Sequence, residues 1–410
     1  MNRIQRIILC IGLFALTTIS PNNSYAATVI ATGANPDACN QTVSLSANVS
    51  SVRSGQDCIV TFTNSSETIW TVPTGVTRVS AIVIGGGGGG GDSGANRTGG
   101  GGGSGGFFQN ANIYVADTIA VVAGVGGSGS TSTTQGASGG TSYFGALKVG
   151  GGGGGNGVTY QGGLRARTGV GGSDFVSSGS GGGGRPTGVT SYTNEITGGL
   201  AGAYSASGVS FLGYTYTGIQ GVVGGNPSDG SSGGLGGVTT PSSNRTSSIT
   251  GSSTEYSKVA LFRPWEDAQN SAGPKTYGSG GSPNYGYGSD PSVTGGAGAD
   301  GVVIIRYTLV PSISAPTYSG PITKGLTESV TVTVNLSGKI RFFIDGKRIP
   351  GCASVITSGT APNLVATCTW KPSVSGNRVL YATFTPTDGT SGVVNTTKIL
   401  LPVERRTNKR

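Results

Sequence analysis

The chain has 410 residues, of which 79 are glycine and 18 are proline, and only 10% are charged. This composition excludes coiled coils and long solvated helices, whereas the clustered 35% of hydrophobic residues still suffices for a core in some segments. Arg3 and Arg6 contribute +2 and the tail 404–410 contributes +3 to the formal net charge of +9, so the remaining +4 is too small for a nucleic-acid-binding surface.

Residues 1–26 have the pattern of a secretory signal peptide. Two arginines precede the apolar stretch 7–19, and Ser24-Tyr25-Ala26 provides a cleavage site. This stretch is too short to span a bilayer, and no later segment is long and apolar enough to do so. We therefore expect an exported protein, secreted or at the cell surface, without a transmembrane segment after cleavage.

Composition divides the mature chain into four segments. Residues 27–61 form an N-terminal β segment rich in Ser, Thr and Asn, and residues 62–308 contain nearly all the glycine. Residues 309–403 return to an ordinary composition, and residues 404–410 form a basic tail that we expect to be disordered.

The four cysteines that remain after cleavage form two closely spaced pairs outside the reducing cytoplasm. We expect structural disulfides Cys39–Cys58 and Cys352–Cys368, each stabilising the fold by about 3 kcal/mol. Neither pair has the Cys-x-x-Cys spacing of a zinc site, and the chain has no histidine. The sequence therefore predicts no metal site.

Apolar, β-branched segments alternate with glycine runs in the glycine-rich segment. Residues 81–84 lead into Gly85–Gly91, and residues 142–149 lead into a second run at 150–155. The order reverses at the end, where glycines lead into the segment 302–307. Such runs predict strands, as does the alternating stretch 112–129, and no segment has a period of 3.6 residues. The sequence therefore predicts an all-β protein.

The glycine runs have two interpretations. A flexible tether should occur once, between domains, whereas these runs recur within one region and each begins or ends at a strand. Polyglycine can instead form a left-handed threefold helix of the polyproline II type, whose backbone groups point outward. In a bundle of such rods, neighbours satisfy each N–H and C=O, and only glycine permits the close approach. We favour the packed bundle over disordered loops.

The segment 309–403 predicts a small immunoglobulin-like β-sandwich. Regular short strands, a cysteine pair and Trp370 close to Cys368 are typical of that fold. Asp345-Gly346-Lys347 predicts a tight hairpin turn. The expected strands are 329–336, 339–344, 365–370, 378–384 and 397–403.

Three kinds of chemistry can be weighed and set aside. Without histidine, the commonest general base is missing, and the adjacent Glu266 and Asp267 would point to opposite faces of a strand. Gly124–Gly129 matches a dinucleotide fingerprint, but no helix can follow it. Asp300 lies in a single copy of a calcium nonapeptide, whose site requires tandem copies. We therefore expect no enzyme, no cofactor and no metal ligand.

Aromatic residues are scattered among Ser, Gly, Thr and Asn between residues 160 and 287. This mixture is typical of paratopes, in which rigid rings make contact and small polar residues adapt to the ligand. In the alternative interpretation, the rings cap the ends of the glycine bundle and are buried. The candidate ligand-binding residues are Tyr204, Phe211, Tyr214, Tyr216, Trp265, Tyr285 and Tyr287.

Two stretches resemble known families. The segment TIWTVPTGVTRVSAIVIGGGGGGG at 68–91 and the closing GGAGADGVVIIRY resemble the glycine-rich domain of bacterial surface proteins and phage tail adhesins. This resemblance covers about 62–308 and implies a polyglycine II core whose loops bind a host receptor. Residues 342–373 are similar to the immunoglobulin-like repeats of bacterial cell-surface proteins. The signal peptide and the appended domain favour an exported bacterial product over a phage fibre.

These observations predict an exported, adhesin-like binding protein without enzymatic activity. Its rigid glycine-rich scaffold would present aromatic and polar loops to a cell-surface glycan or to another envelope protein. The alternative is a structural component of an extracellular matrix or surface layer, without a specific ligand. Ice binding by a repetitive face is a weaker third hypothesis, because the glycines lack a regular triplet spacing.

Overall fold

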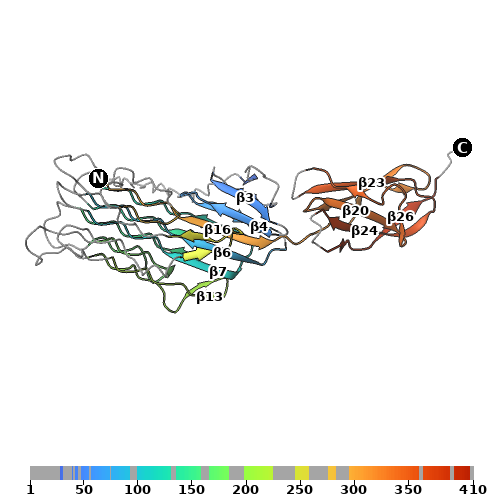
Figure 1. Cartoon of the computed structure of the whole chain (residues 1–410). Coiled ribbons are helices and arrows are strands. Elements are labelled where there is room, and N and C mark those ends of the chain that lie inside the picture. The colour runs from blue at the N-terminus through green and yellow to red at the C-terminus, as the bar shows by residue number, and fades with distance from the viewer. Residues whose placement is uncertain are drawn as a thin grey trace, which may run out of the picture.

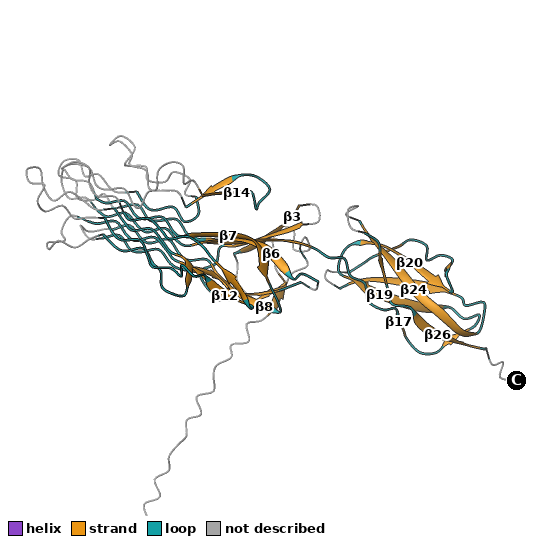
Figure 2. Cartoon of the chain, turned by 90° about the horizontal axis from the view of Figure 1, so that it is seen from below, coloured by secondary structure: helices purple, strands orange, loops and turns teal. Residues whose placement is uncertain are grey.

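A computed structural model describes much of the chain after residue 27. The described ranges are 28–30, 39, 42–44, 48–54, 57–73, 75–92, 99–130, 135–157, 166–183, 198–224, 245–257, 276–282, 295–359, 363–387 and 392–406. In these ranges every regular element is a strand, which confirms the all-β class, and no helix there could cross a membrane. The expected signal peptide lies outside the described residues. A bundle of extended segments, a pair of sheets and a C-terminal unit follow one another along the molecule (Figures 1 and 2).

A five-stranded antiparallel sheet joins the two ends of the glycine-rich segment. Val303 lies between Phe62 and Val83 in the register, so the strand that closes the segment pairs with strands near its start. The disulfide Cys39–Cys58, confirmed with an S–S distance of 2.05 Å, ties the preceding chain to this sheet. The strand order is β3 (Val49–Ser54), β4 (Asp57–Phe62), β16 (Val302–Thr308), β6 (Arg78–Ile84) and β7 (Phe107–Tyr114).

A second sheet packs against the first. Trp70 of the second sheet is fully buried, and its ring centroid lies 5.6 Å from that of Tyr307 in the five-stranded sheet and 6.1 Å from that of Phe144. Large buried aromatic rings of this kind dominate the stability of such an interface. The strand order is β1 (Thr28–Ile30), β2 (Thr42–Ser44), β5 (Thr68–Thr71), β8 (Thr118–Val122), β9 (Ser142–Phe144), β10 (Leu147–Val149) and β11 (Phe175–Ser177).

The strands of both sheets continue into extended rods that form the glycine bundle (Figure 2). The rod of Gly85–Gly91 follows β6 directly and occupies the interior, where all seven glycines are buried. Its N–H groups point in three directions in turn, because residues three apart donate to the same neighbouring rod. All seven N···O distances lie between 2.8 and 3.1 Å. The first neighbouring rod accepts the bonds Gly85 to Gly106, Gly88 to Gly103 and Gly91 to Gly100. The second accepts Gly86 to Gly140 and Gly89 to Ala137, and the third accepts Gly87 to Ala299 and Gly90 to Gly296.

The carbonyl groups of the same rod accept from three further rods. One rod donates from Gly152 to Gly86 and from Gly155 to Gly89, and a second donates from Gly127 to Gly87 and from Ser130 to Gly90. The third donates from Gly281 to Gly88. The central rod therefore has six hydrogen-bonded neighbours, as in a hexagonal array of threefold helices. No glycine of this run has a positive φ, as expected for the left-handed polyproline II type. The expectation of a packed bundle is confirmed, and the tether interpretation is wrong for these runs.

Side chains have no room along the central rod, Gly85–Gly91. A Cβ atom built on any of Gly85–Gly91 would lie 1.9–2.2 Å from a backbone oxygen of an adjacent rod. The adjacent rods come so close that main chain packs on main chain. The interior of the bundle is therefore held by backbone hydrogen bonds, while apolar side chains fill the core between the two sheets.

The C-terminal unit consists of two sheets around a common apolar core that includes Phe342 and Phe384. The disulfide Cys352–Cys368 is confirmed, as is the tight turn, where Asp345 and Gly346 both have positive φ, 47° and 79°. One sheet contains β17 (Thr317–Tyr318), β19 (Glu328–Val334) and β23 (Leu364–Trp370). The other contains β18 (Ile322–Thr323), β26 (Ile399–Glu404), β24 (Gly376–Pro386), β20 (Gly338–Ile344) and β21 (Lys347–Arg348), with β22 (Val355–Ile356) and β25 (Val394–Asn395) paired to β20 and β24.

Candidate functional site

Three of the predicted aromatic residues lie on one β-hairpin. Strands β12 (Val209–Phe211) and β13 (Tyr214–Tyr216) pair antiparallel around Leu212 and Gly213. Both turn residues have positive φ, 49° and 80°, which is the geometry of a two-residue type I′ turn. The alternation of residues 209–211 and 214–216 about a glycine is the local signal for this hairpin.

Two of these rings attach the hairpin to the sheets. The Phe211 ring meets Phe144 edge to face, with centroids 6.3 Å apart. Gly145 lies beneath it with φ of 58°, and a Cβ there would lie 2.5 Å from the Phe211 ring. The phenol oxygen of the buried Tyr216 accepts the N–H of Tyr114 at 2.9 Å, which satisfies a donor on β7, the edge strand of its sheet. Phe211 and Tyr216 therefore pack within the protein.

Tyr214 is exposed and forms what we call the Tyr214 platform with Arg78 and Tyr114. Its ring stacks on Tyr114 with centroids 3.5 Å apart and planes 3° from parallel, yet Tyr214 remains 45% exposed. The Arg78 guanidinium lies 4.4 Å from the Tyr114 ring centroid and donates a hydrogen bond to the Tyr114 hydroxyl. Hydrogen bonding with Tyr114 is the main factor that raises the pKa of Tyr214. The platform thus offers a fixed aromatic ring next to a cation.

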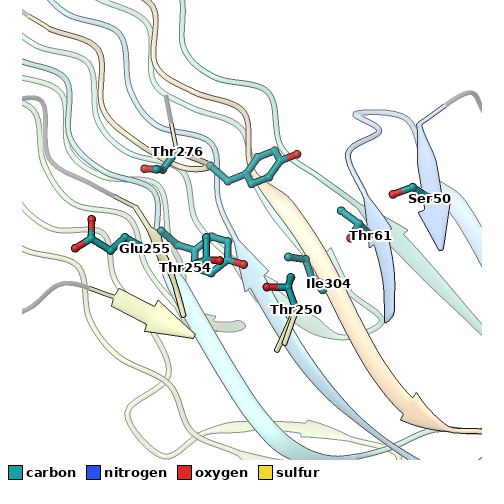
Figure 3. A pocket seen from close by; sticks show the side chains of 9 residues that line it. Ser50, Thr61, Thr250, Thr254, Glu255, Thr276 and Ile304 are labelled. Atoms are coloured by element: carbon teal, nitrogen blue, oxygen red, sulfur yellow. The ribbon is translucent and has the colours of Figure 1, made fainter. Parts of the chain in front are cut away.

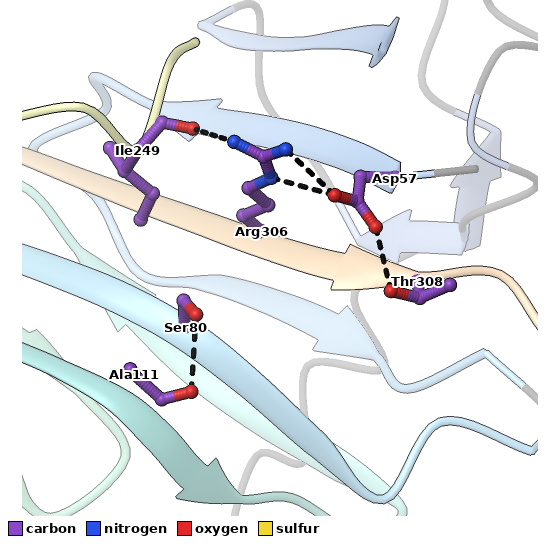
Figure 4. A network of polar contacts seen from close by, with 6 residues as sticks. All are labelled: Asp57, Ser80, Ala111, Ile249, Arg306 and Thr308. Atoms are coloured by element: carbon purple, nitrogen blue, oxygen red, sulfur yellow. Dashed lines mark hydrogen bonds and ion pairs between the residues drawn. The ribbon is translucent and has the colours of Figure 1, made fainter. Parts of the chain in front are cut away.

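A β-bulge lies directly beside the platform. Val79 pairs with Ile113 whereas Ala81 pairs with Asn110, so β7 has one extra residue between them. Ser80 Oγ donates to the carbonyl oxygen of Ala111 within this bulge at 3.1 Å (Figure 4). Bulges redirect side chains at functional sites. No local sequence signal marks Arg78 and Tyr114, because strand pairing between distant segments brings them together with Tyr214.

The remaining predicted residues fall into two groups. Tyr204 is half-buried in the segment before β12. The Asp300 carboxylate accepts the N–H of Gly126 at 2.7 Å, and the described residues contain no group of three or more potential metal ligands. The predicted binding residues Trp265, Tyr285 and Tyr287, and the carboxylate pair Glu266 and Asp267, lie outside the described residues.

A second candidate site is a pocket of 480 Å³ (Figure 3) beside β14 (Arg245–Ser247), a strand on the opposite side of the molecule from β12 (Figure 2). The pocket lies between the five-stranded sheet and the hairpin of β14 and β15 (Thr254–Tyr256). Most of its lining residues carry a hydroxyl group, and no pattern in the sequence indicated this site. The lining residues are Ser50, Thr61, Thr250, Thr254, Glu255, Tyr256, Thr276, Tyr277 and Ile304.

An ion pair fixes the hairpin next to this pocket (Figure 4). Arg306 binds one carboxylate oxygen of Asp57 through Nε at 2.9 Å and Nη2 at 2.8 Å, and it donates through Nη1 to the carbonyl oxygen of Ile249 at 3.5 Å. Thr308 donates to the other Asp57 oxygen at 2.6 Å. Burial alone would raise the pKa of Asp57, but the hydrogen bonds from Thr308 and Arg306 and the charge of Arg306 outweigh it and hold this pKa below its ordinary value.

Comparison with known proteins supports the architecture of the glycine-rich part. A family model described as a glycine-rich domain matches residues 63–308, well over half of the chain. No curated protein matches the chain. The match begins one residue after β4 and ends with the last residue of β16, so it includes the central part of both packed sheets and every rod of the bundle. The chain therefore belongs to the glycine-rich domain family.

Proposed function

We propose that this chain is an exported bacterial surface or secreted protein that binds a glycan, in the manner of an adhesin and without catalysing a reaction. The observation that carries the proposal is the Tyr214 platform, an exposed, pre-stacked tyrosine beside an arginine on a hairpin docked to a stiff scaffold. The signal-peptide pattern of residues 1–26 supports export.

The platform meets two requirements of sugar recognition. Tyrosine rings supply large amphipathic contact areas at low entropic cost, and Tyr214 is already held by Tyr114 before a ligand arrives. Arg78 adds a cation that favours carboxylate- or sulfate-bearing sugars. We therefore assign the platform to acidic glycans of a cell surface.

The rest of the chain fits this role. The resemblance to phage tail adhesins implies that glycine-rich scaffolds present receptor-binding surfaces, and the bundle supplies a rigid support here. The C-terminal unit, which we interpret as immunoglobulin-like, would act as a spacer or second contact. Another protein of the envelope is the alternative partner for the same surface.

Glycan-array binding of the exported protein tests the proposal. Tyr214→Ala should weaken binding to acidic glycans by about tenfold or more, as for aromatic residues at interface hot spots. Tyr318→Ala is the matched control, because Tyr318 is 37% exposed on β17, outside the glycine-rich segment. Equal binding by the protein with and without the Tyr214 ring would contradict the proposed role of the platform.

A structural role is the second candidate function, and the outer rods favour it. In the rod 218–224, glycine occurs at every third residue and faces inward, while Ile219 and Val223 are 46% and 52% exposed. Leu200 on the adjacent rod is also 46% exposed. Assembly of chains through this edge would bury these side chains. Sedimentation tests it, because a strict monomer at high concentration contradicts lateral assembly.

A further inference from the structure

We propose that the pocket between the β14–β15 hairpin and the five-stranded sheet binds a neutral sugar residue of a polysaccharide. The site is independent of the Tyr214 platform, since the two hairpins lie on opposite sides of the molecule (Figure 2). At 480 Å³, the pocket falls within the range of about 300–1,000 Å³ that is typical of ligand sites.

The floor of the pocket is a row of three residues across neighbouring strands. Ser50 on β3 pairs with Thr61 on β4, and Thr61 pairs with Ile304 on β16. Residues that are directly opposite in adjacent antiparallel strands project from the same face of the sheet. The hairpin covers the neighbouring apolar part of this face with Ile249 and Tyr256. The two hydroxyls of the floor therefore remain open to the pocket.

The walls add further hydroxyl groups on both sides (Figure 3). On the hairpin side, the hydroxyls of Thr250 and Thr254 each donate to the carbonyl oxygen of Ser252 at 3.4 Å. On the other side, Tyr277 is 38% exposed, and its carbonyl oxygen accepts the N–H of Ser257 at 2.8 Å. This bond fixes the backbone that carries the Tyr277 ring, which offers a flat surface for stacking.

The chemistry of the lining selects the class of ligand. Seven of the nine lining residues carry hydroxyl groups, which both donate and accept hydrogen bonds, as the hydroxyls of a sugar do. Glu255 adds a carboxylate, and none of the nine lining residues is lysine or arginine. None of these nine residues offers a positive charge to a phosphate, sulfate or uronic acid group. A neutral sugar matches both features.

The pocket is formed before a ligand binds, because two arginines hold the hairpin in place. Arg306 anchors one end of it through the hydrogen bond to the carbonyl oxygen of Ile249. At the other end, the Arg245 side chain donates to the carbonyl oxygen of Gly105 in the glycine bundle at 3.1 Å, and burial lowers its pKa to about 10. A ligand therefore meets ordered walls and loses little affinity to reorganisation.

The test uses the exported protein and a set of soluble tri- to hexasaccharides from neutral glucans, galactans and mannans, with acidic oligosaccharides alongside. Titration calorimetry should detect saturable binding of at least one neutral oligosaccharide. Tyr277→Ala should weaken that binding by about tenfold or more. Thr61→Val and Thr254→Val should each weaken it by about three- to tenfold, as expected for one lost neutral hydrogen bond.

Two control variants separate binding in this pocket from binding elsewhere on the protein. Thr331→Val is the matched control, because Thr331 is half-buried on β19, as Thr61 is on β4. Tyr214→Ala should weaken the binding of acidic glycans but leave the binding of neutral sugars unchanged. The two proposals can therefore fail separately, because each site is tested with its own ligand and its own variants. The proposal is overturned if no neutral oligosaccharide binds, if acidic ones bind more tightly through the pocket, or if the pocket variants bind as well as Thr331→Val.

Discussion

Replacing Gly88 by alanine places a single methyl group in the centre of the glycine bundle. The added Cβ would lie 2.2 Å from the carbonyl oxygen of Gly153, whereas real Cβ atoms essentially never come within 3.0 Å of such an atom. The two rods must therefore separate by at least about 0.8 Å, the difference between these two distances. No flexible side chain can absorb this shift, because both partners are main chain.

The cost follows from the hydrogen bonds that the shift breaks. Two bonds join these rods on either side of Gly88, from the N–H of Gly152 to the carbonyl oxygen of Gly86 and from the N–H of Gly155 to that of Gly89, both at 2.8 Å. When the rods move apart by about 0.8 Å, these N···O distances become longer than those of hydrogen bonds. Two buried bonds at about 1–2 kcal/mol each give a loss of about 2–4 kcal/mol in the free energy of unfolding. This is a large part of the roughly 5–15 kcal/mol of a typical domain.

Urea denaturation measures this loss, with hydrogen exchange of peptides from 85–106 as the readout local to the bundle. Gly392→Ala is the matched control, because no atom lies within 4 Å of its added Cβ and its φ is not positive. It should change the free energy of unfolding by less than about 1 kcal/mol, in the stabilising direction. Equal stability of Gly88→Ala and Gly392→Ala would refute the close approach of the rods.

Three further predictions concern the supports of the two sites. Because the pKa of Asp57 is lowered, its ion pair should stabilise the fold above the unfolded pKa of about 3.9 and lose this effect as the pH falls through the folded pKa. The excess stability of the wild type over Asp57→Asn in thermal melts should therefore shrink on acidification, and a constant difference would contradict this account. Gly145→Ala should displace the β12–β13 hairpin and weaken acidic-glycan binding about as much as Tyr214→Ala, whereas unchanged binding would show that the hairpin does not need this glycine. Removing the disulfide with Cys352→Ala and Cys368→Ala should lower the free energy of unfolding of the C-terminal unit by about 3 kcal/mol, and a loss near zero in urea titrations would contradict this.

Local patterns predicted most of the fold. The apolar segments before and after the glycine runs became strands, and the two cysteine pairs formed disulfides. The stretch 112–129, however, is not one alternating segment, because Asp117 has a positive φ of 51° and the chain turns there from β7 into β8 of the other sheet. A turn made by a residue other than glycine has a weak sequence signal, since most such residues avoid positive φ.

The order of the rods and the partners of Tyr214 could not be predicted. Glycine runs are identical in composition, so nothing local shows that the rod 85–91 contacts the rod 295–301. The rod 218–224 has glycine at every third position only, which suffices at an edge because just one of its faces meets other rods. Arg78 and Tyr114 reach Tyr214 through strand register and a bulge, both of which depend on residues far apart in the chain.

Amide hydrogen exchange of Gly85–Gly91 tests the central claim most directly, because each of these N–H groups donates to a different position of the surrounding rods. If the bundle is the interior of this domain, these amides should exchange on the order of a thousandfold or more slowly than in a free glycine peptide. Exchange at the rate of the free peptide would contradict the claim that main chain packed on main chain holds the domain together.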